Sequence, residues 1–236
     1  MGLTMWPIPS LDHNIVTISF SSDNLVCSWI QKTKTGTAPL RLCAYQRYQL
    51  THLELANLIL FNPTTIKKYI TFFLQKHNLY DAFIVCSFEG AVIAETFIAM
   101  PTATPHRADF GIPISSNTVW EYRYMYPNDH SQHVFYIYTM PRFLVLQYQL
   151  LAITMRCNVI TMTTKTMALF YAYKTIFGAA FRKSQLAVDM MRHHNNIEDL
   201  ISLDALRRMI SMPLEINVKD EKSFIATAVG LFCAER

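Results

Sequence analysis

Residues 14–31, NIVTISFSSDNLVCSWIQ, decide the fold because they place a polar turn between two apolar segments. The flanking segments, 14–20 and 25–31, are rich in β-branched and aromatic residues, which favour strands. The four residues between them, Ser-Ser-Asp-Asn, have short polar side chains that suit a turn. The stretch therefore predicts a β-hairpin that opens the fold.

Strand and helix patterns alternate along the rest of the chain. Apolar runs predict strands at 40–49, 82–88, 91–99, 120–126, 133–140 and 157–163. Helical spacing and capping residues predict helices at 62–78, at 141–155, from Thr163 or Thr164 to Gly178, and at 223–234. A two-residue turn at Glu89-Gly90 is expected to join two of the strands as a hairpin. This order is typical of the ribonuclease-H-like and actin-like α/β folds, in which helices pack on the faces of a sheet.

The composition restricts the classes of function. The 236 residues are 51% hydrophobic and 16% charged, which excludes intrinsic disorder. The net charge of +4 is spread thinly, so we expect no nucleic-acid partner. Five cysteines without a C-x-x-C pair indicate a reducing compartment. The N-terminus lacks a signal-peptide pattern and no apolar stretch is long enough to span a bilayer, so we expect no direct membrane insertion.

Motifs that carry catalysis are scarce. The chain contains no G-x-S-x-G, G-x-G-x-x-G or G-x-x-x-x-G-K-[ST] sequence. A ribonuclease-H-like nuclease needs carboxylates for two metal ions, beginning in the opening strand, but that strand carries Ser19 and no acid. Asp129, His130 and His133 could together bind a metal, which leaves a metal enzyme as one alternative. A solvated polar turn is the favoured interpretation of these three residues.

Six tyrosines between 122 and 148 form the most distinctive excess. Within the two strands expected there they alternate, so that each set shares one face. Tyrosine combines a large apolar body with a polar tip, which suits interfaces, while an aromatic sheet core is an equally favoured reading. The residues expected to bind a partner are Tyr122, Tyr124, Tyr126, Tyr136 and Tyr138.

Several segments resemble the PilM family, the cytoplasmic actin-like proteins of the type IV pilus inner-membrane platform. The opening hairpin, FIVCSFEGAVIAETFIAMP at 83–101, the order of elements over 134–169, and FIATAVGLF at 224–232 carry this resemblance. The chain is also similar to the cytoplasmic part of the type II secretion protein GspL. The resemblance implies a single actin-like domain over 1–236, with a small subdomain inserted at about 89–140 and the second actin-like half largely missing.

The opening hairpin departs from the family at its phosphate loop. Ser19 replaces the family's aspartate, Ser21 its glycine and Val26 its lysine. No D-x-G sequence follows Gly178, where the second half of a nucleotide site would lie. We therefore expect no nucleotide and no other cofactor, with a divergent actin-like ATPase as the alternative function.

The resemblance implies a non-catalytic cytoplasmic adaptor, peripheral to the inner membrane through a partner. That partner would be a PilN-like membrane protein, whose short cytoplasmic peptide would bind in a groove between the core sheet and the inserted subdomain. The assembly ATPase is a second candidate partner.

Overall fold

A six-stranded mixed sheet forms the centre of the protein. The computed structural model describes residues 14–33, 38–112, 115–127, 132–178 and 197–234. The strand order is β10-β6-β1-β2-β3-β11. These strands are β1 (Ile15–Phe20), β2 (Asn24–Lys32), β3 (Leu40–Gln49), β6 (Phe83–Phe88), β10 (Asn158–Thr164) and β11 (Ile210–Ser211). Short elements complete the main body: β4 (Leu55–Ala56), β5 (Ile59–Leu60), α5 (Ile197–Leu200) and α6 (Leu203–Met209).

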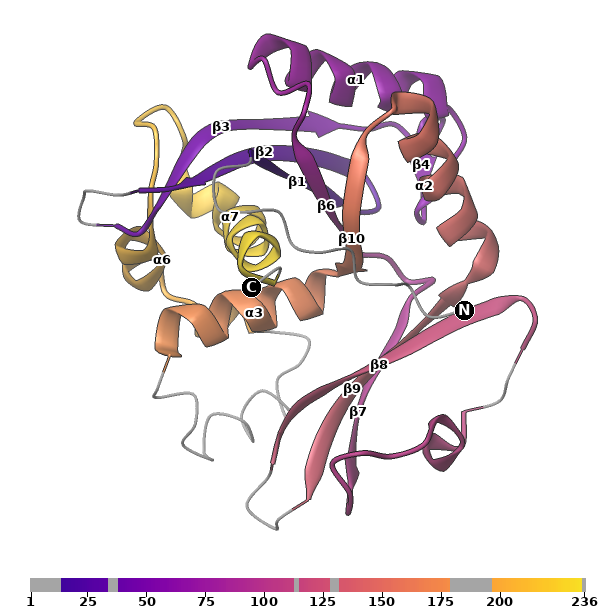
Figure 1. Ribbon diagram of the computed structural model, residues 1–236. Helices are drawn as coiled ribbons and strands as arrows, with labels where there is room; N and C mark the ends of the chain where they lie inside the picture. The colour runs from indigo at the N-terminus through magenta and orange to yellow at the C-terminus, as the bar shows by residue number, and fades with distance from the viewer. Residues whose placement is uncertain (1–13, 34–37, 113–114, 128–131, 179–196, 235–236) are drawn as a thin grey trace.

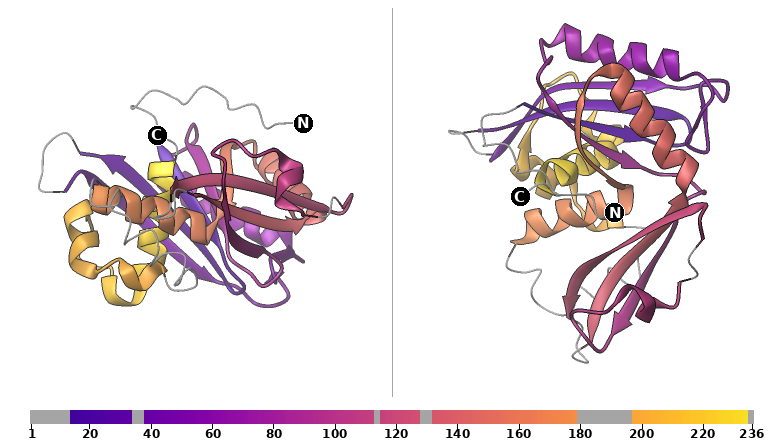
Figure 2. Two further views of the ribbon diagram at one scale, coloured as in Figure 1. Left: turned by 90° about the horizontal axis from the view of Figure 1, so that it is seen from below. Right: turned by 45° about the vertical axis from the view of Figure 1, so that its right-hand side comes forward.

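Helices cover both faces of this sheet (Figures 1 and 2). One face packs against α1 (Pro63–Lys76) and α2 (Arg142–Met155), and the other packs against α3 (Lys165–Phe177) and α7 (Val218–Ala234). The α/β fold class expected from the order of elements is thus confirmed.

The opening hairpin forms as expected. β1 and β2 pair antiparallel from Ile15↔Ile30 to Phe20↔Leu25. β1 also pairs parallel with β6, and β6 pairs parallel with β10. The carboxyl ends of β1, β6 and β10 therefore meet at one edge of the sheet.

The helices begin where capping chemistry places them. Asn62 Oδ1 accepts a hydrogen bond from the Thr65 amide at 3.1 Å, and Pro63 occupies the first helical position. Thr164 caps α3, since its Oγ1 accepts from the Met167 amide at 3.2 Å. Across the described residues, no helix combines the length and the hydropathy that crossing a bilayer requires.

The prediction of a hairpin at Glu89-Gly90 is wrong. β7 (Ala94–Met100) does not pair with β6 but with β9 (His133–Pro141), beginning at Ala94↔Thr139. The reason is that β6 is central in the main sheet, so β1 and β10 already occupy both of its edges. The chain therefore leaves the main sheet after Glu89.

A second sheet, with the order β7-β9-β8, lies beside the main body (Figure 1). β8 spans Thr118–Pro127. One face of this small sheet packs under the short helix η1 (Arg107–Phe110), around Phe110 and Trp120. The other face, which carries Tyr136, belongs to the same buried cluster as the side chains of α3.

Candidate functional site

Polar side chains gather where the parallel strands β1, β6 and β10 end. In open α/β sheets, ligands bind outside the carboxyl ends of the strands, which makes this edge the candidate site. We call the group the strand-end cluster; it comprises Ser19, Ser21, Ser87, Glu89, Glu95, Tyr136, Thr164, Lys165, Thr166 and Glu198.

Hydroxyl groups occupy the place where the PilM resemblance would put a phosphate loop. Ser87 Oγ donates to Ser19 Oγ at 3.0 Å, and both side chains are buried. Ser21 Oγ is buried and has no hydrogen-bond partner among the described residues. Val26 pairs with Ser19 across the hairpin and is buried in the sheet. This loop therefore offers neither a carboxylate for a magnesium-bound water nor a cation for a phosphate.

Carboxylates converge on the first turn of α3. Lys165 Nζ lies 2.8 Å from Glu89 Oε1 and 3.3 Å from Glu198 Oε2. Thr166 Oγ1 donates to Glu95 Oε2 at 2.6 Å. The amino terminus of a helix attracts anions, and here side chains of the protein itself supply them. A phosphate brought to this helix would meet negative charge already in place.

A buried tyrosine links this helix start to the small sheet. Tyr136 Oη donates to Glu95 Oε1 at 2.5 Å and is also hydrogen-bonded to Thr164 Oγ1. Burial, together with the charge of Glu95, raises the pKa of Tyr136 well above its usual value. The phenol therefore stays neutral and keeps its proton to donate. The arrangement links α3 to the small sheet.

The charge on Glu198 is stabilised in the same cluster. Burial alone would raise its pKa, but a hydrogen bond from Ser223 Oγ at 2.5 Å and the nearby Lys165 ammonium outweigh that effect. The pKa of Glu198 consequently lies below its ordinary value. The ion pair with Lys165 is thus present at neutral pH.

The five tyrosines predicted to bind a partner do not share one surface in the structure. Tyr122 and Tyr124 pair with Ile137 and Phe135, and so they share one face of the small sheet. Tyr124 is 47% exposed, whereas Tyr122 is half-buried with its ring 4.7 Å from that of Phe110. Tyr126 also lies in β8, but its side chain falls outside the described part of the structure.

The expectation that Tyr136 and Tyr138 contact a partner needs correction. They lie on the opposite face of the sheet from Tyr124 and are 0% and 7% exposed. The physical reason is that this face packs into the cluster that includes α3, so both rings are core residues. Of the five tyrosines, Tyr124 is the one shown to present a large exposed surface.

The proposed metal ligands are only partly described. Asp129 and His130 lie outside the described residues, while the Nδ1 atom of His133 is 3.3 Å from Tyr124 Oη. Within the described ranges, no group of three or more His, Cys, Asp or Glu residues is placed to hold a metal ion.

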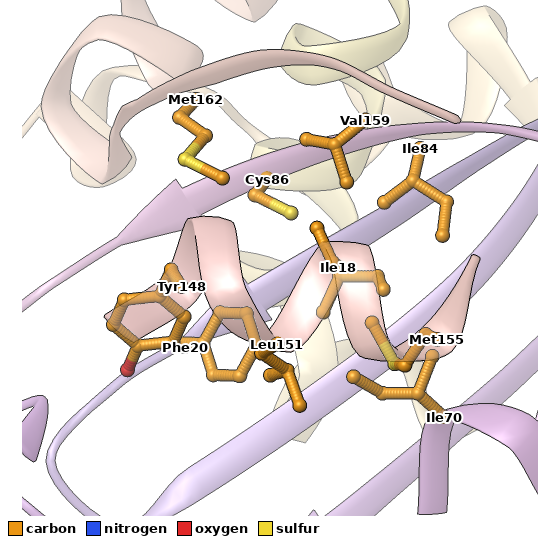
Figure 3. A pocket seen from close by; sticks show the side chains of 11 residues that line it. Ile18, Phe20, Ile70, Ile84, Cys86, Tyr148, Leu151, Met155, Val159 and Met162 are labelled. Atoms are coloured by element: carbon orange, nitrogen blue, oxygen red, sulfur yellow. The ribbon is translucent and has the colours of Figure 1, made fainter. Parts of the chain in front are cut away.

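A small pocket under α2 is lined by apolar side chains (Figure 3). Its cavity volume is about 10 Å³, which is at most the space of one water molecule. Ile18 and Phe20 of β1 lie opposite Leu151 and Met155 of α2, with the Cys86 thiol between the layers. Burial raises the pKa of Cys86 to about 12, so this thiol is no nucleophile. The pocket is a packing gap and not a ligand site.

Sequence reasoning did not identify the acidic residues of the strand-end cluster. Glu95 carries no motif that marks it as functional, and the TTKT segment at 163–166 predicts only the start of a helix. A signal existed in that segment, because hydroxyls and a lysine follow directly on a buried strand and open a helix. Its carboxylate partners come from distant parts of the chain, so no local pattern could reveal them.

Comparisons with known proteins agree with this fold. No family model matches the sequence, and no curated protein matches it. The structure is similar to a solved structure described as a PilM-PilN type IV pilus biogenesis complex, with a TM-score of 0.51 and 13% identity. The match covers 68% of this chain and 50% of that chain, so it spans half the length of the solved protein.

A second solved structure is the cytoplasmic domain of EpsL, an inner membrane component of the type II secretion system of Vibrio cholerae. Its TM-score is 0.40 at 7% identity, with 66% of this chain and 58% of that chain covered. The resemblance to the PilM family that the sequence suggested is thus confirmed at the level of the fold.

Proposed function

We propose that this chain is a non-catalytic adaptor of a type IV pilus or type II secretion assembly platform. It binds the cytoplasmic peptide of a PilN-like membrane protein and is held at the inner membrane by that partner. The fold shared with the solved PilM-PilN complex supports this proposal. The assembly ATPase is a second candidate partner.

The observation that carries the proposal is the exposed Tyr124 on the flank of the small sheet. β9 is the central strand, and the outer edge of β8 pairs with no strand of the described residues. An extended peptide can add to such an edge through its backbone. Tyr124 belongs to β8, the strand with this edge, and its ring packs 5.5 Å from Phe135 and 5.7 Å from His133 of β9. A rigid aromatic surface next to a free edge suits the capture of a short peptide.

Replacing Tyr124 with alanine is expected to weaken peptide binding by about tenfold or more, because exposed tyrosines that become buried at interfaces often contribute about 2 kcal/mol. The measurement is isothermal titration with a synthetic peptide of the cytoplasmic tail of the membrane protein encoded beside this chain.

Tyr80→Ala is the matched control, since Tyr80 is also exposed but lies after α1, outside the small sheet. The Tyr80→Ala variant should bind the peptide with the same affinity as the unaltered protein. Equal binding by Tyr124→Ala would refute the peptide site, and no binding by any form would refute the adaptor function.

The strand-end cluster supports a role without nucleotide. Ser19 and Ser21 replace the acid and the glycine of the family's phosphate loop, and Glu89, Glu95 and Glu198 surround the start of α3. Each added carboxylate near a phosphate costs free energy through like-charge repulsion.

Titration with magnesium ATP is expected to give no binding heat at protein concentrations that detect a Kd of about 100 μM. A nucleotide-binding PilM protein run in the same buffer shows that the assay works. Binding at micromolar affinity, or ATP hydrolysis that Glu89→Ala alters, would instead favour the divergent ATPase.

A further inference from the structure

The outer helix layer carries a groove that no part of the described chain fills. It runs between α1 and α2 and has a cavity volume of about 750 Å³. Both helices lie on the face of the main sheet opposite α3 and α7 (Figures 1 and 2). Leu60 and Leu151 contribute to its lining, and Phe72 and Leu150 line it from the two helices. Lys67 Nζ donates to the Thr154 carbonyl at 2.8 Å, which ties the two helices together beside the groove.

An apolar stripe on α2 extends this groove outward. Phe143, Leu146, Leu150 and Ile153 are all exposed, and their spacing of three, four and three residues places them on one face of the helix. The opposite face of α2 is the one that packs on the sheet, through residues such as Leu144 and Tyr148. The helix is therefore apolar on two sides, and the described residues of the chain cover only one of them. A heptad-like stripe of this spacing is the pattern that receives another helix.

The positive charge of this surface favours an acidic partner. Neither α1 nor α2 contains an aspartate or glutamate, and the groove lining contains none either. Lys67, Lys68 and Lys76 lie on α1, while Arg142 and Arg156 flank the two ends of α2. A second copy of this chain would bring the same positive charges face to face, which opposes self-association through this surface. An acidic partner would gain from the same charges.

The concave shape distinguishes between acidic partners. A lipid surface is flat over this distance and would leave the floor of the groove uncovered, whereas a helix, about 10 Å across, can pack between two others. We propose that the α1/α2 groove binds one amphipathic helix of a partner protein, with acidic residues on both sides of its apolar stripe. This surface is separate from the Tyr124 site on β8, so the two proposals can fail independently.

The test uses a labelled synthetic helix of about three heptads, with leucine on its apolar stripe and glutamate on both flanks. Fluorescence anisotropy should show saturable binding to the unaltered protein, weakened by about 0.5 M NaCl because salt screens charge pairs. Leu150→Glu should reduce the affinity for the peptide by about tenfold or more. Lys68→Glu should reduce both the affinity and the dependence of the affinity on salt concentration. Both side chains are exposed, so these variants are expected to fold.

Leu214→Glu and Lys219→Glu are the matched controls, because both residues are exposed and lie outside the groove. They should bind like the unaltered protein, and bound peptide should slow amide exchange in 63–76 and 142–155. A peptide with lysine in place of glutamate should not bind.

Three results would overturn the proposal. The first is absent binding of the acidic helix, or equal binding by Leu150→Glu. The second is Leu150-dependent binding to anionic phosphatidylglycerol vesicles without binding to the peptide, which would assign the surface to a membrane. The third is Leu150-dependent dimerisation in sedimentation, which would assign it to a second copy of the chain.

Discussion

Gly230→Ala is expected to destabilise the protein by about 3 kcal/mol or more, the upper end for overpacking a core. An added Cβ at Gly230 would lie 1.7 Å from the Ala168 carbonyl oxygen and 2.5 Å from its carbon. Those atoms belong to the backbone of α3, so no side-chain rotation relieves the clash and the two helices must separate. For a chain of this size the loss corresponds to a fall in Tm of about 10 °C, measurable by calorimetry.

Two further variants test the cause of that loss. Ala168→Gly should not rescue Gly230→Ala, because the clash is with the backbone of Ala168 and not with its methyl group. Gly111→Ala should cost only about 1–2 kcal/mol, since nothing lies within 4 Å of its added Cβ and the cost comes from its φ of +63°. A Gly230→Ala protein as stable as the parent would show that α3 and α7 are not this close.

Tyr136→Phe is expected to cost about 2 kcal/mol, although it removes a single oxygen atom. The hydroxyl is completely buried, donates to Glu95 Oε1 and is hydrogen-bonded to Thr164 Oγ1. Its loss leaves a carboxylate oxygen without this donor at the junction of the small sheet and α3. Urea denaturation measures the change in the free energy of unfolding.

Tyr124→Phe is the control for that prediction, because it removes the same atom from an exposed ring. Its effect should stay within about 0.5 kcal/mol. A double-mutant cycle with Glu95→Gln should give a coupling energy of about 1 kcal/mol between the two sites. Equal stability of Tyr136→Phe and the parent would mean that the phenol does not link the two parts.

Local chemistry predicted the elements of the fold well. The caps at Asn62 and Thr164 and the turn after Phe20 are decided by residues only a few positions apart, so the sequence displays them directly. The pairing of β7 was not predictable in this way. Both edges of β6 are occupied by β1 and β10, and β10 lies some 70 residues further along the chain.

The candidate site was predictable only in part. The replacements at Ser19 and Ser21 could be read from the opening hairpin, and the structure places them at and just after the end of β1. The sequence could not predict that Glu89, Glu95 and Glu198 converge on Lys165 or its neighbours. This convergence depends on how the small sheet and α5 pack against α3.

The sequence by itself determined the strands, the helices and the absence of a carboxylate in the opening strand, because propensity, capping and residue identity are local. Only the tertiary structure decided which face of each element is buried. It turned Tyr136 into a core residue while leaving Tyr124 exposed, although the same alternating pattern carries both. The tertiary structure also reversed the expected effect of replacing Gly230 with alanine on stability. Alanine stabilises an isolated helix relative to glycine. In α7, however, the backbone of α3 leaves no room for the added methyl group.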